Sequence, residues 1–203
     1  MTAATLTHVG RDLAIPRESE GFDMPAMASK MWRPMLAMGL MAVAAGVVVG
    51  AVQATLDNSL SVSQVAAWNA GVLFLGIGLL LSAVTFLLAT ILGELRDGGT
   101  SVQRALGEKA LILKRPLTGK LFPAAMMMGL MTLLAALVIG FIQAAKLDTD
   151  PAAAADIAAW VTPLRFAGLA LLFTGVSLAL ATIVRALRFQ ASRIQDIAAD
   201  RAA

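Results

Sequence analysis

Four long segments of the chain are almost free of charged residues, and shorter segments with polar or charged residues separate them. The apolar segments run from Pro34 to Leu56, from Trp68 to Leu92, from Leu121 to Ala145 and from Trp160 to about Leu187. Each exceeds the roughly 20 residues that an α-helix needs to cross a hydrocarbon core of about 30 Å. The pattern therefore predicts four transmembrane helices.

The composition of the chain supports this pattern. Of the 203 residues, 59% are hydrophobic and 14% are charged, whereas about a quarter of the residues in a soluble domain are charged. We expect an all-α integral membrane protein, a bundle of four transmembrane helices without a separate soluble domain. The expected divisions are a poorly ordered cytoplasmic leader (1–33), a first transmembrane hairpin (34–95), a cytoplasmic crossover (96–120), a second transmembrane hairpin (121–188) and a cytoplasmic tail (189–203).

The lysines and arginines predict the orientation of these helices. The leader, the crossover and the tail hold 14 of the 16, and the hairpin loops hold only Lys146, with Arg165 just inside the fourth segment. Because these residues resist translocation, the segments that carry them face the cytoplasm. The alanine-rich, lysine-poor composition is typical of a bacterial source. We expect a multi-pass protein of the bacterial cytoplasmic (inner) membrane with both termini in the cytoplasm.

The two predicted hairpins resemble each other in sequence. At an offset of 90, Met38-Gly39-Leu40-Met41 matches Met128-Gly129-Leu130-Met131, and at an offset of 92, Ala89-Thr90-Ile91 matches Ala181-Thr182-Ile183. Further matches are Gln53 with Gln143, Trp68 with Trp160, Phe74 with Phe166 and Gly76 with Gly168. Shared hydrophobicity does not place such residues in register, so we predict a tandem duplication of a two-helix hairpin. Both units hold an even number of spans, which predicts a parallel repeat with a pseudo-twofold axis along the membrane normal.

Turn residues predict where the helices begin and end. Gly98-Gly99 is expected to end the second helix, and the segment from Thr100 to about Gly107 is expected to form a short amphipathic turn. Asp150 followed by Pro151 is typical of a helix start. The fourth helix is therefore expected to begin before its apolar segment.

Small residues recur at every fourth position of the first and third segments, and this spacing allows helix backbones to approach closely. The central positions of these stripes are Gly46, Gly50, Ala136 and Gly140. We expect them to pack inside the bundle or between the hairpins, and the alternative is an outward stripe that binds another subunit. Gln53 and Gln143 lie near the outer ends of the same segments. Interhelical hydrogen bonds are expected for both, and contact with a headgroup or ligand is the alternative.

Aromatic and basic residues mark the predicted membrane boundaries. Trp32, Trp68 and Trp160 each lie at the end of an apolar segment, where an amphipathic indole ring is most stable. Arg165 follows Trp160 by about one and a half turns. We expect its long side chain to anchor the helix by reaching outward to Asp156 or to lipid phosphate. A buried charge in a transport path is the alternative.

Residues for catalysis and metal binding are scarce. The chain has no cysteine, and its one histidine, His8, precedes the first segment, so this chain alone holds no thiolate or intramembrane histidine site. Methionines, which bind Cu(I) but also fill cores, cluster in two segments. They are Met35, Met38, Met41, Met126, Met127, Met128 and Met131. We expect packing, no cofactor and, since the basic residues follow the topology, no nucleic-acid partner.

The central part of each apolar segment lacks Asp, Glu, Lys and His, and ion-coupled transporters need ionisable groups at that depth. No nucleotide-binding, protease or calcium-binding motif occurs either. The sequence favours a non-catalytic membrane accessory or scaffold subunit that packs against a larger membrane complex or against itself. Two alternatives stay open: a small channel or facilitator for a lipophilic solute or quinone, and a subunit that forms one wall of an intramembrane enzyme.

Overall fold

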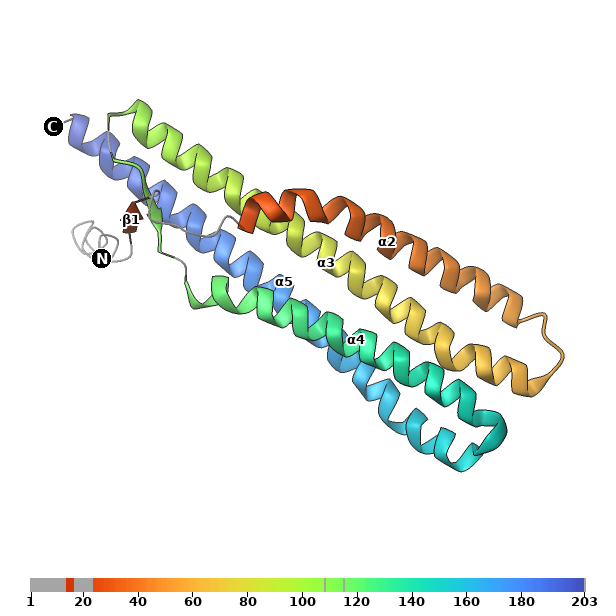
Figure 1. The fold of residues 1–203 in the computed structure, drawn as a ribbon. Helices are drawn as coiled ribbons and strands as arrows, with labels where there is room; N and C mark the ends of the chain where they lie inside the picture. The colour runs from red at the N-terminus through yellow and green to blue at the C-terminus, as the bar shows by residue number, and fades with distance from the viewer. Residues whose placement is uncertain (1–13, 17–23, 108, 115, 203) are drawn as a thin grey trace.

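The computed structural model describes residues 14–16, 24–107, 109–114 and 116–202, and it consists of long helices with one short ribbon (Figure 1). The helices are α2 (Met24–Gln53), α3 (Ser59–Ala105), α4 (Leu117–Thr149) and α5 (Pro151–Ala202). The strands β1 (Ala14–Pro16) and β2 (Leu111–Leu113) pair antiparallel. The expected all-α class is confirmed, although the two-stranded ribbon was not predicted.

The four helices are long and apolar enough to cross a membrane. They contain the second, third and fourth predicted segments in full, and α2 ends at Gln53, three residues before the predicted end of the first. Helices α2 and α3 form one antiparallel hairpin, and α4 and α5 form the other (Figure 1). The turns of both hairpins lie at one end of the molecule, which we call the loop end. The ribbon and the C-terminal parts of α3 and α5 lie at the opposite end, which we call the terminal end.

Helices α3 and α5 continue far beyond their apolar segments. They contain 47 and 52 residues, which at about 1.5 Å per residue is more than twice a hydrocarbon core of roughly 30 Å. The prediction that Gly98-Gly99 ends the second helix is wrong, because α3 continues to Ala105. A Cβ added at Gly99 would lie 2.4 Å from the side chain of Gln190, so this glycine allows α5 to approach. Gly107, at φ 76°, makes the turn instead.

The expected amphipathic turn from Thr100 to Gly107 is thus mainly the last part of α3, and it holds a buried glutamine. Gln103 is fully buried, and its Nε2 donates to Leu111 O at 3.1 Å and to Gln190 Oε1 at 3.0 Å. Its Oε1 accepts from Leu111 N at 2.9 Å. One side-chain amide therefore joins α3, β2 and α5.

Helix α2 begins ten residues before the first apolar segment, at Met24. The expected poor order of the leader is therefore wrong for 24–33, where Ala28 is fully buried in a cluster with Ala89 and Phe122. The remaining residues of the expected leader, apart from β1, lie outside the described residues.

The predicted start of the fourth helix is confirmed. Helix α5 begins at Pro151, and Asp150 Oδ1 accepts a hydrogen bond from Ala153 N at 3.1 Å. This contact satisfies one of the backbone donors that a helix start leaves free.

In each hairpin, glycines of one helix contact branched side chains of the other and allow the two helices to approach closely. The pairs are Gly39 with Leu80 and Gly76 with Val43 in the first hairpin, and Gly129 with Leu172 and Gly168 with Leu133 in the second. A Cβ added to any of these glycines would lie 2.7 to 2.9 Å from its partner side chain. These contacts therefore require glycine.

The two hairpins do not contact each other symmetrically. Helix α4 packs on both α3 and α5, whereas α2 packs extensively only on α3. A pseudo-twofold axis would place α2 on α5 in the way that α4 lies on α3, so the expected symmetric arrangement is not found. The core lies between α3, α4 and α5, where Leu133 and Leu172 are 1% and 0% exposed.

Candidate functional site

The small residues at the centres of the two predicted stripes lie in helix contacts. Gly46 faces Leu73 of α3, and Gly50 lies near Asn69 of the same helix. Ala136 is fully buried, and Gly140 lies against the backbone oxygen of Ala67. The stripe on α2 therefore packs within its own hairpin, while Gly140 lies at a contact between the hairpins.

The two equivalent glutamines have different surroundings. Gln53 Nε2 donates to Val62 O at 3.2 Å, which links α2 to α3. Gln143 is half-buried and makes no hydrogen bond with another described residue. Asn69, which sequence reasoning missed, is 5% exposed and donates to Gly46 O at 3.0 Å. Its only signal was an amide inside an otherwise apolar segment.

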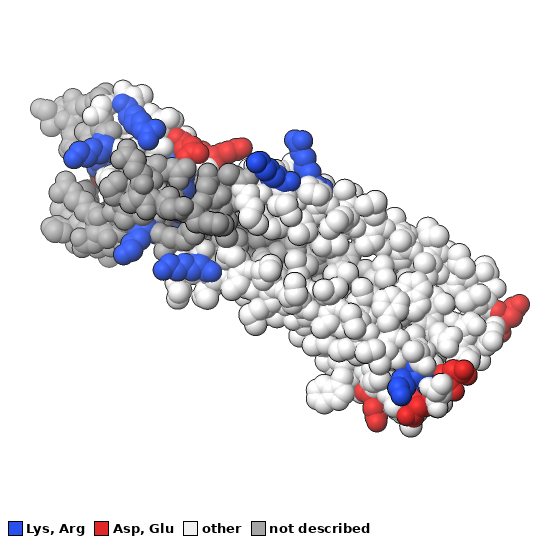
Figure 2. Space-filling view, viewed as in Figure 1, with Lys and Arg blue, Asp and Glu red and all other residues white. Residues whose placement is uncertain are grey.

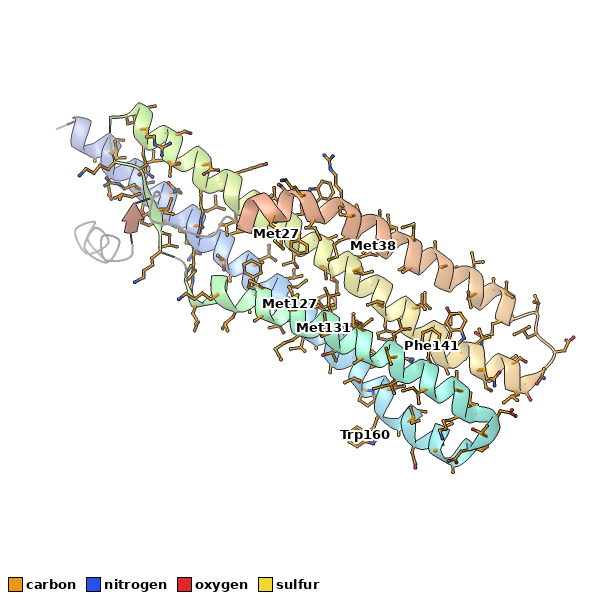
Figure 3. The ribbon with its side chains drawn as sticks, in the orientation of Figure 1. Met27, Met38, Met127, Met131, Phe141 and Trp160 are labelled. Carbon is orange, nitrogen blue, oxygen red and sulfur yellow. The ribbon has the colours of Figure 1, made fainter. Side chains whose placement is uncertain are left out.

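The three tryptophans also differ from one another. Trp68 is half-buried and stacks on Phe141 of α4 with ring centroids 5.7 Å apart. Trp160 is 79% exposed and points away from the bundle (Figure 3). The Trp32 ring lies 5.3 Å from the guanidinium carbon of Arg33. Equivalent positions, 68 and 160, thus face a helix in one hairpin and no helix in the other.

Arg165 does not reach outward to Asp156 as expected. Its side chain is only 7% exposed, and Nη2 donates to Ala67 O of α3 at 2.7 Å. Nε is buried without a hydrogen-bond partner. Next to the guanidinium lies a cavity of about 310 Å³, which we call the loop-end cavity. It is lined by Ser63, Ala66, Ala67, Gln143, Leu147, Ala158, Val161, Thr162 and Arg165.

A second cavity, of about 170 Å³, lies nearer the terminal end between α2, α3 and α4. Its apolar wall includes Met27, Met35, Met126 and Met127, and Figure 3 shows Met27 and Met127 on the two facing helices. The other clustered methionines, Met38, Met41, Met128 and Met131, are exposed. Among the described residues, no group of three His, Cys, Asp or Glu side chains could hold a metal ion. We call this second space the methionine cavity.

A packed layer lies between the two cavities. On α4, Leu133 and Ala136 lie between the residues that line the methionine cavity and those that line the loop-end cavity. They are 1% and 0% exposed. A Cβ added at Gly78 would lie 2.4 Å from Leu133 Cδ1. The described side chains therefore close the bundle at this level.

An exposed stripe of apolar side chains runs along α5 at seven-residue spacing. Its large members are Phe166 (58% exposed), Phe173 (56%), Leu180 (47%), Leu187 (45%) and Ile194 (37%). Four positions after each of these lies a further exposed residue. These are Ala170, Ser177, Val184, Ala191 and Ala198. We call these ten residues the α5 stripe.

The corresponding face of α3 is covered. At the offset of 92, the first eight residues of the α5 stripe correspond to Phe74, Gly78, Leu81, Thr85, Leu88, Leu92, Leu95 and Gly99, all buried or half-buried. We call these eight the α3 stripe. Helix α4 covers part of it, since Thr85 Oγ1 donates to Met126 Sδ at 3.3 Å. Helix α5 covers other parts, and Phe74 meets Phe166 edge-on with ring centroids 5.4 Å apart.

No protein-family model, no curated protein and no solved structure matches this chain. Its function therefore has to be inferred from the arrangement of its own residues.

Proposed function

We propose that this chain is a multi-pass protein of the bacterial cytoplasmic membrane, with both termini in the cytoplasm, and that it is a non-catalytic scaffold that assembles with further copies of itself. The four long apolar helices support insertion into a bilayer. On the face in Figure 2, charged side chains lie near the loop end and in the terminal half, and the broad band between them carries none. Lipid can cover such a band without leaving charges in hydrocarbon.

The packing of the hairpins supports an origin by tandem duplication. The contact of Gly39 with Leu80 corresponds to that of Gly129 with Leu172 at the same offsets that align the sequences. The contact of Gly76 with Val43 corresponds in the same way to that of Gly168 with Leu133. The two hairpins thus share contacts as well as residues.

The α5 stripe is the observation that carries the scaffold proposal. In a bilayer, lipid covers exposed side chains such as Phe173 at no cost. From Trp160 to Ile194, however, α5 extends about 51 Å at 1.5 Å per residue, and a bilayer with its headgroups is only about 40–45 Å thick. Leu187, about 40 Å from Trp160, therefore lies at the edge of the bilayer, and Ile194 lies beyond it, where water would meet its side chain. A heptad-spaced apolar stripe that continues from the bilayer into water is typical of a helix that packs against another helix.

A second copy of the chain presents a matching surface. The residues of α4 that face the α3 stripe and its flank include Met126, Leu130 and Leu137. At the offset of 90 they correspond on α2 to Leu36, Leu40 and Val47, which are 37%, 55% and 60% exposed. We infer that α2 of one copy packs on α5 of the next in the way that α4 packs on α3. Such a head-to-tail contact builds rings or chains of subunits.

Disulfide crosslinking tests this contact, because the chain has no cysteine of its own. The test pair is Leu36→Cys in one copy and Ser177→Cys in another, which corresponds to the contact between Thr85 and Met126. Oxidation of membranes that contain both variants is expected to give a crosslinked dimer, while either variant alone stays monomeric on a denaturing gel. The matched control is one chain with Thr85→Cys and Met126→Cys, which should form an internal disulfide.

The other outcomes separate the competing assemblies. A crosslink formed by Ser177→Cys alone would indicate a symmetric pair of α5 helices in place of the contact between α2 and α5. A different membrane protein crosslinked to Ser177→Cys would make the chain an accessory subunit of a larger complex. A monomeric mass in mild detergent together with no crosslink in membranes would contradict the scaffold function.

The methionine cavity favours one second function, the binding of a lipophilic solute or quinone. Its wall is almost wholly apolar, and Ala89, at 5% exposed, lies in it. The packed layer around Leu133 argues against passage through a single bundle. Ala89→Phe should fill the cavity. Mass spectrometry of solvent extracts should then show a lipophilic molecule with the wild-type protein and not with the variant, and equal yields would contradict this function.

A further inference from the structure

The loop-end cavity has the features of a binding site rather than of a packing defect. It lies where α3, α4 and α5 meet and is open to the outside of the bundle. Four side chains in its wall are polar: Ser63, Gln143, Thr162 and Arg165. The Ser63 hydroxyl already donates to Ser59 O at 2.9 Å, so the donors directed to a bound molecule come from Gln143, Thr162 and Arg165. None of the described residues that line this cavity is an aspartate or a glutamate.

Arg165 supplies a buried positive charge to this cavity. Arg165 is only 7% exposed. A guanidinium has five N–H donors, and one of them donates a hydrogen bond to Ala67 O. Nε has no partner, and no described carboxylate forms an ion pair with this guanidinium. A buried charge without an opposite charge is costly. An anion in the adjacent cavity would supply the missing charge.

Packing of the hairpin does not require arginine at this position. The equivalent residue of the first hairpin is Leu73, which packs against Gly46. The second hairpin also keeps a glycine that makes room for the guanidinium. A Cβ added at Gly140 would lie 3.1 Å from Arg165 Nη2 and 2.9 Å from Ala67 O. The contact between α3 and α4 is therefore shaped around the arginine.

Gln143, like Arg165, lines the cavity, whereas its equivalent in the first hairpin, Gln53, is used in packing. Gln53 uses its amide to bond Val62 O in the first hairpin. Gln143 lines the cavity and has no hydrogen bond with another described residue. The second hairpin thus leaves an amide, as well as a guanidinium, available to a molecule in the cavity.

We propose that the loop-end cavity binds a phosphate group, with Arg165 as its charged partner and with Thr162 and Gln143 as further donors. The planar guanidinium matches phosphate oxygens in a forked geometry. The guanidinium, the amide and the Thr162 hydroxyl can each approach a different oxygen, and a phosphate ester or inorganic phosphate offers more acceptor oxygens than a carboxylate does. The phosphate comes either from a lipid headgroup at the membrane surface or from free phosphate. This site does not depend on the assembly of subunits.

The test uses the purified full-length chain in an uncharged maltoside detergent. Phosphatidylglycerol binding is measured by native mass spectrometry against diacylglycerol with the same acyl chains, and free phosphate by equilibrium dialysis with labelled inorganic phosphate. The variant is Arg165→Leu, which restores the leucine of the first hairpin, and its matched control is Arg185→Leu, an exposed arginine of the same helix. We expect Arg165→Leu to weaken binding by at least about tenfold, since hydrogen bonds to charged groups are strong.

Each outcome decides the proposal. Binding of phosphatidylglycerol but not diacylglycerol, lost in Arg165→Leu and kept in Arg185→Leu, supports a headgroup site. Binding of inorganic phosphate with the same dependence supports a site for free phosphate. If Arg165→Leu does not fold, Thr162→Val combined with Gln143→Leu should weaken binding several-fold in a folded protein. No binding of either ligand by the wild-type chain, or equal binding by Arg165→Leu, would overturn the proposal.

Discussion

Helices α3 and α5 have closely similar patterns of residues and different environments. The α3 stripe is buried or half-buried under α4 and α5, and the α5 stripe at equivalent positions is exposed. Phe74 and Phe166 contact each other, yet Phe166 remains 58% exposed. An apolar stripe therefore indicates which face of a helix is suited to contact an apolar surface, but it does not indicate which helix or lipid provides that surface. Helix α4 lies across α3, and no described helix lies in the equivalent place on α5.

The strongest test of this difference is to enlarge one small residue of each stripe. Gly78→Leu should lower the free energy of unfolding by about 3 kcal/mol, because overpacking a tight contact forces neighbours apart. Leu133 lies 2.4 Å from where the new Cβ would be. The equivalent Ala170→Leu faces outward and should change the free energy by less than about 0.5 kcal/mol.

Unfolding of both variants in mixed micelles with increasing SDS, followed by tryptophan fluorescence, measures this difference. Equal destabilisation by the two variants would mean that α5 is as fully covered as α3 in the folded monomer.

A second test compares two equivalent glutamines beyond the apolar segments. Gln103→Leu should lower the free energy of unfolding by about 2 kcal/mol, because it leaves both backbone groups of Leu111 without their partner. Amide hydrogen exchange at Leu111 should also become faster. Gln195→Leu, at the exposed equivalent position of α5, should leave both values unchanged. Unaltered exchange at Leu111 in Gln103→Leu would show that this amide does not hold the ribbon.

The smallest expected effect concerns the two tryptophans. Trp68→Leu removes the ring that stacks on Phe141 and should cost about 1 kcal/mol, the usual value of an aromatic pair. Trp160→Leu removes a ring that is 79% exposed and should not change the unfolding of a single chain. A comparable loss of stability in Trp160→Leu would reveal a partner on this part of α5.

Much of the fold could be predicted from the sequence, because the signals were local. Each apolar segment corresponds to one helix, although α2 ends at Gln53 and not at Leu56, and Asp150-Pro151 marked the start of α5. The signal at Gly98-Gly99 was misleading, because glycine serves both helix ends and close helix contacts. Only the neighbouring Gln190 shows that Gly99 serves the contact. The residue that ends α3 with positive φ is Gly107.

The candidate sites were less predictable. Arg165 could be recognised as an unusual charge in an apolar segment, but its direction could not, because its partner Ala67 O lies 98 residues away in the sequence. The buried amide of Gln103 gave no signal beyond its polarity, since its partners belong to β2 and α5. The methionines of α2 and α4 were visible as clusters. The sequence did not show that Met27, Met35, Met126 and Met127 line one cavity, or that Met126 is buried while Met127 next to it is 58% exposed.

The order of residues along the chain is enough to give the number of apolar helices, the resemblance of the two hairpins and the position of the charges at their ends. These properties depend on composition and period along one helix. The packing of the folded chain adds that α4 covers α3 while the α5 stripe stays exposed, and that Arg165 turns inward to a cavity. The physical reason is that these features depend on how one helix crosses another. Close packing of side chains from distant parts of the chain sets that crossing, and the pattern along a single helix does not.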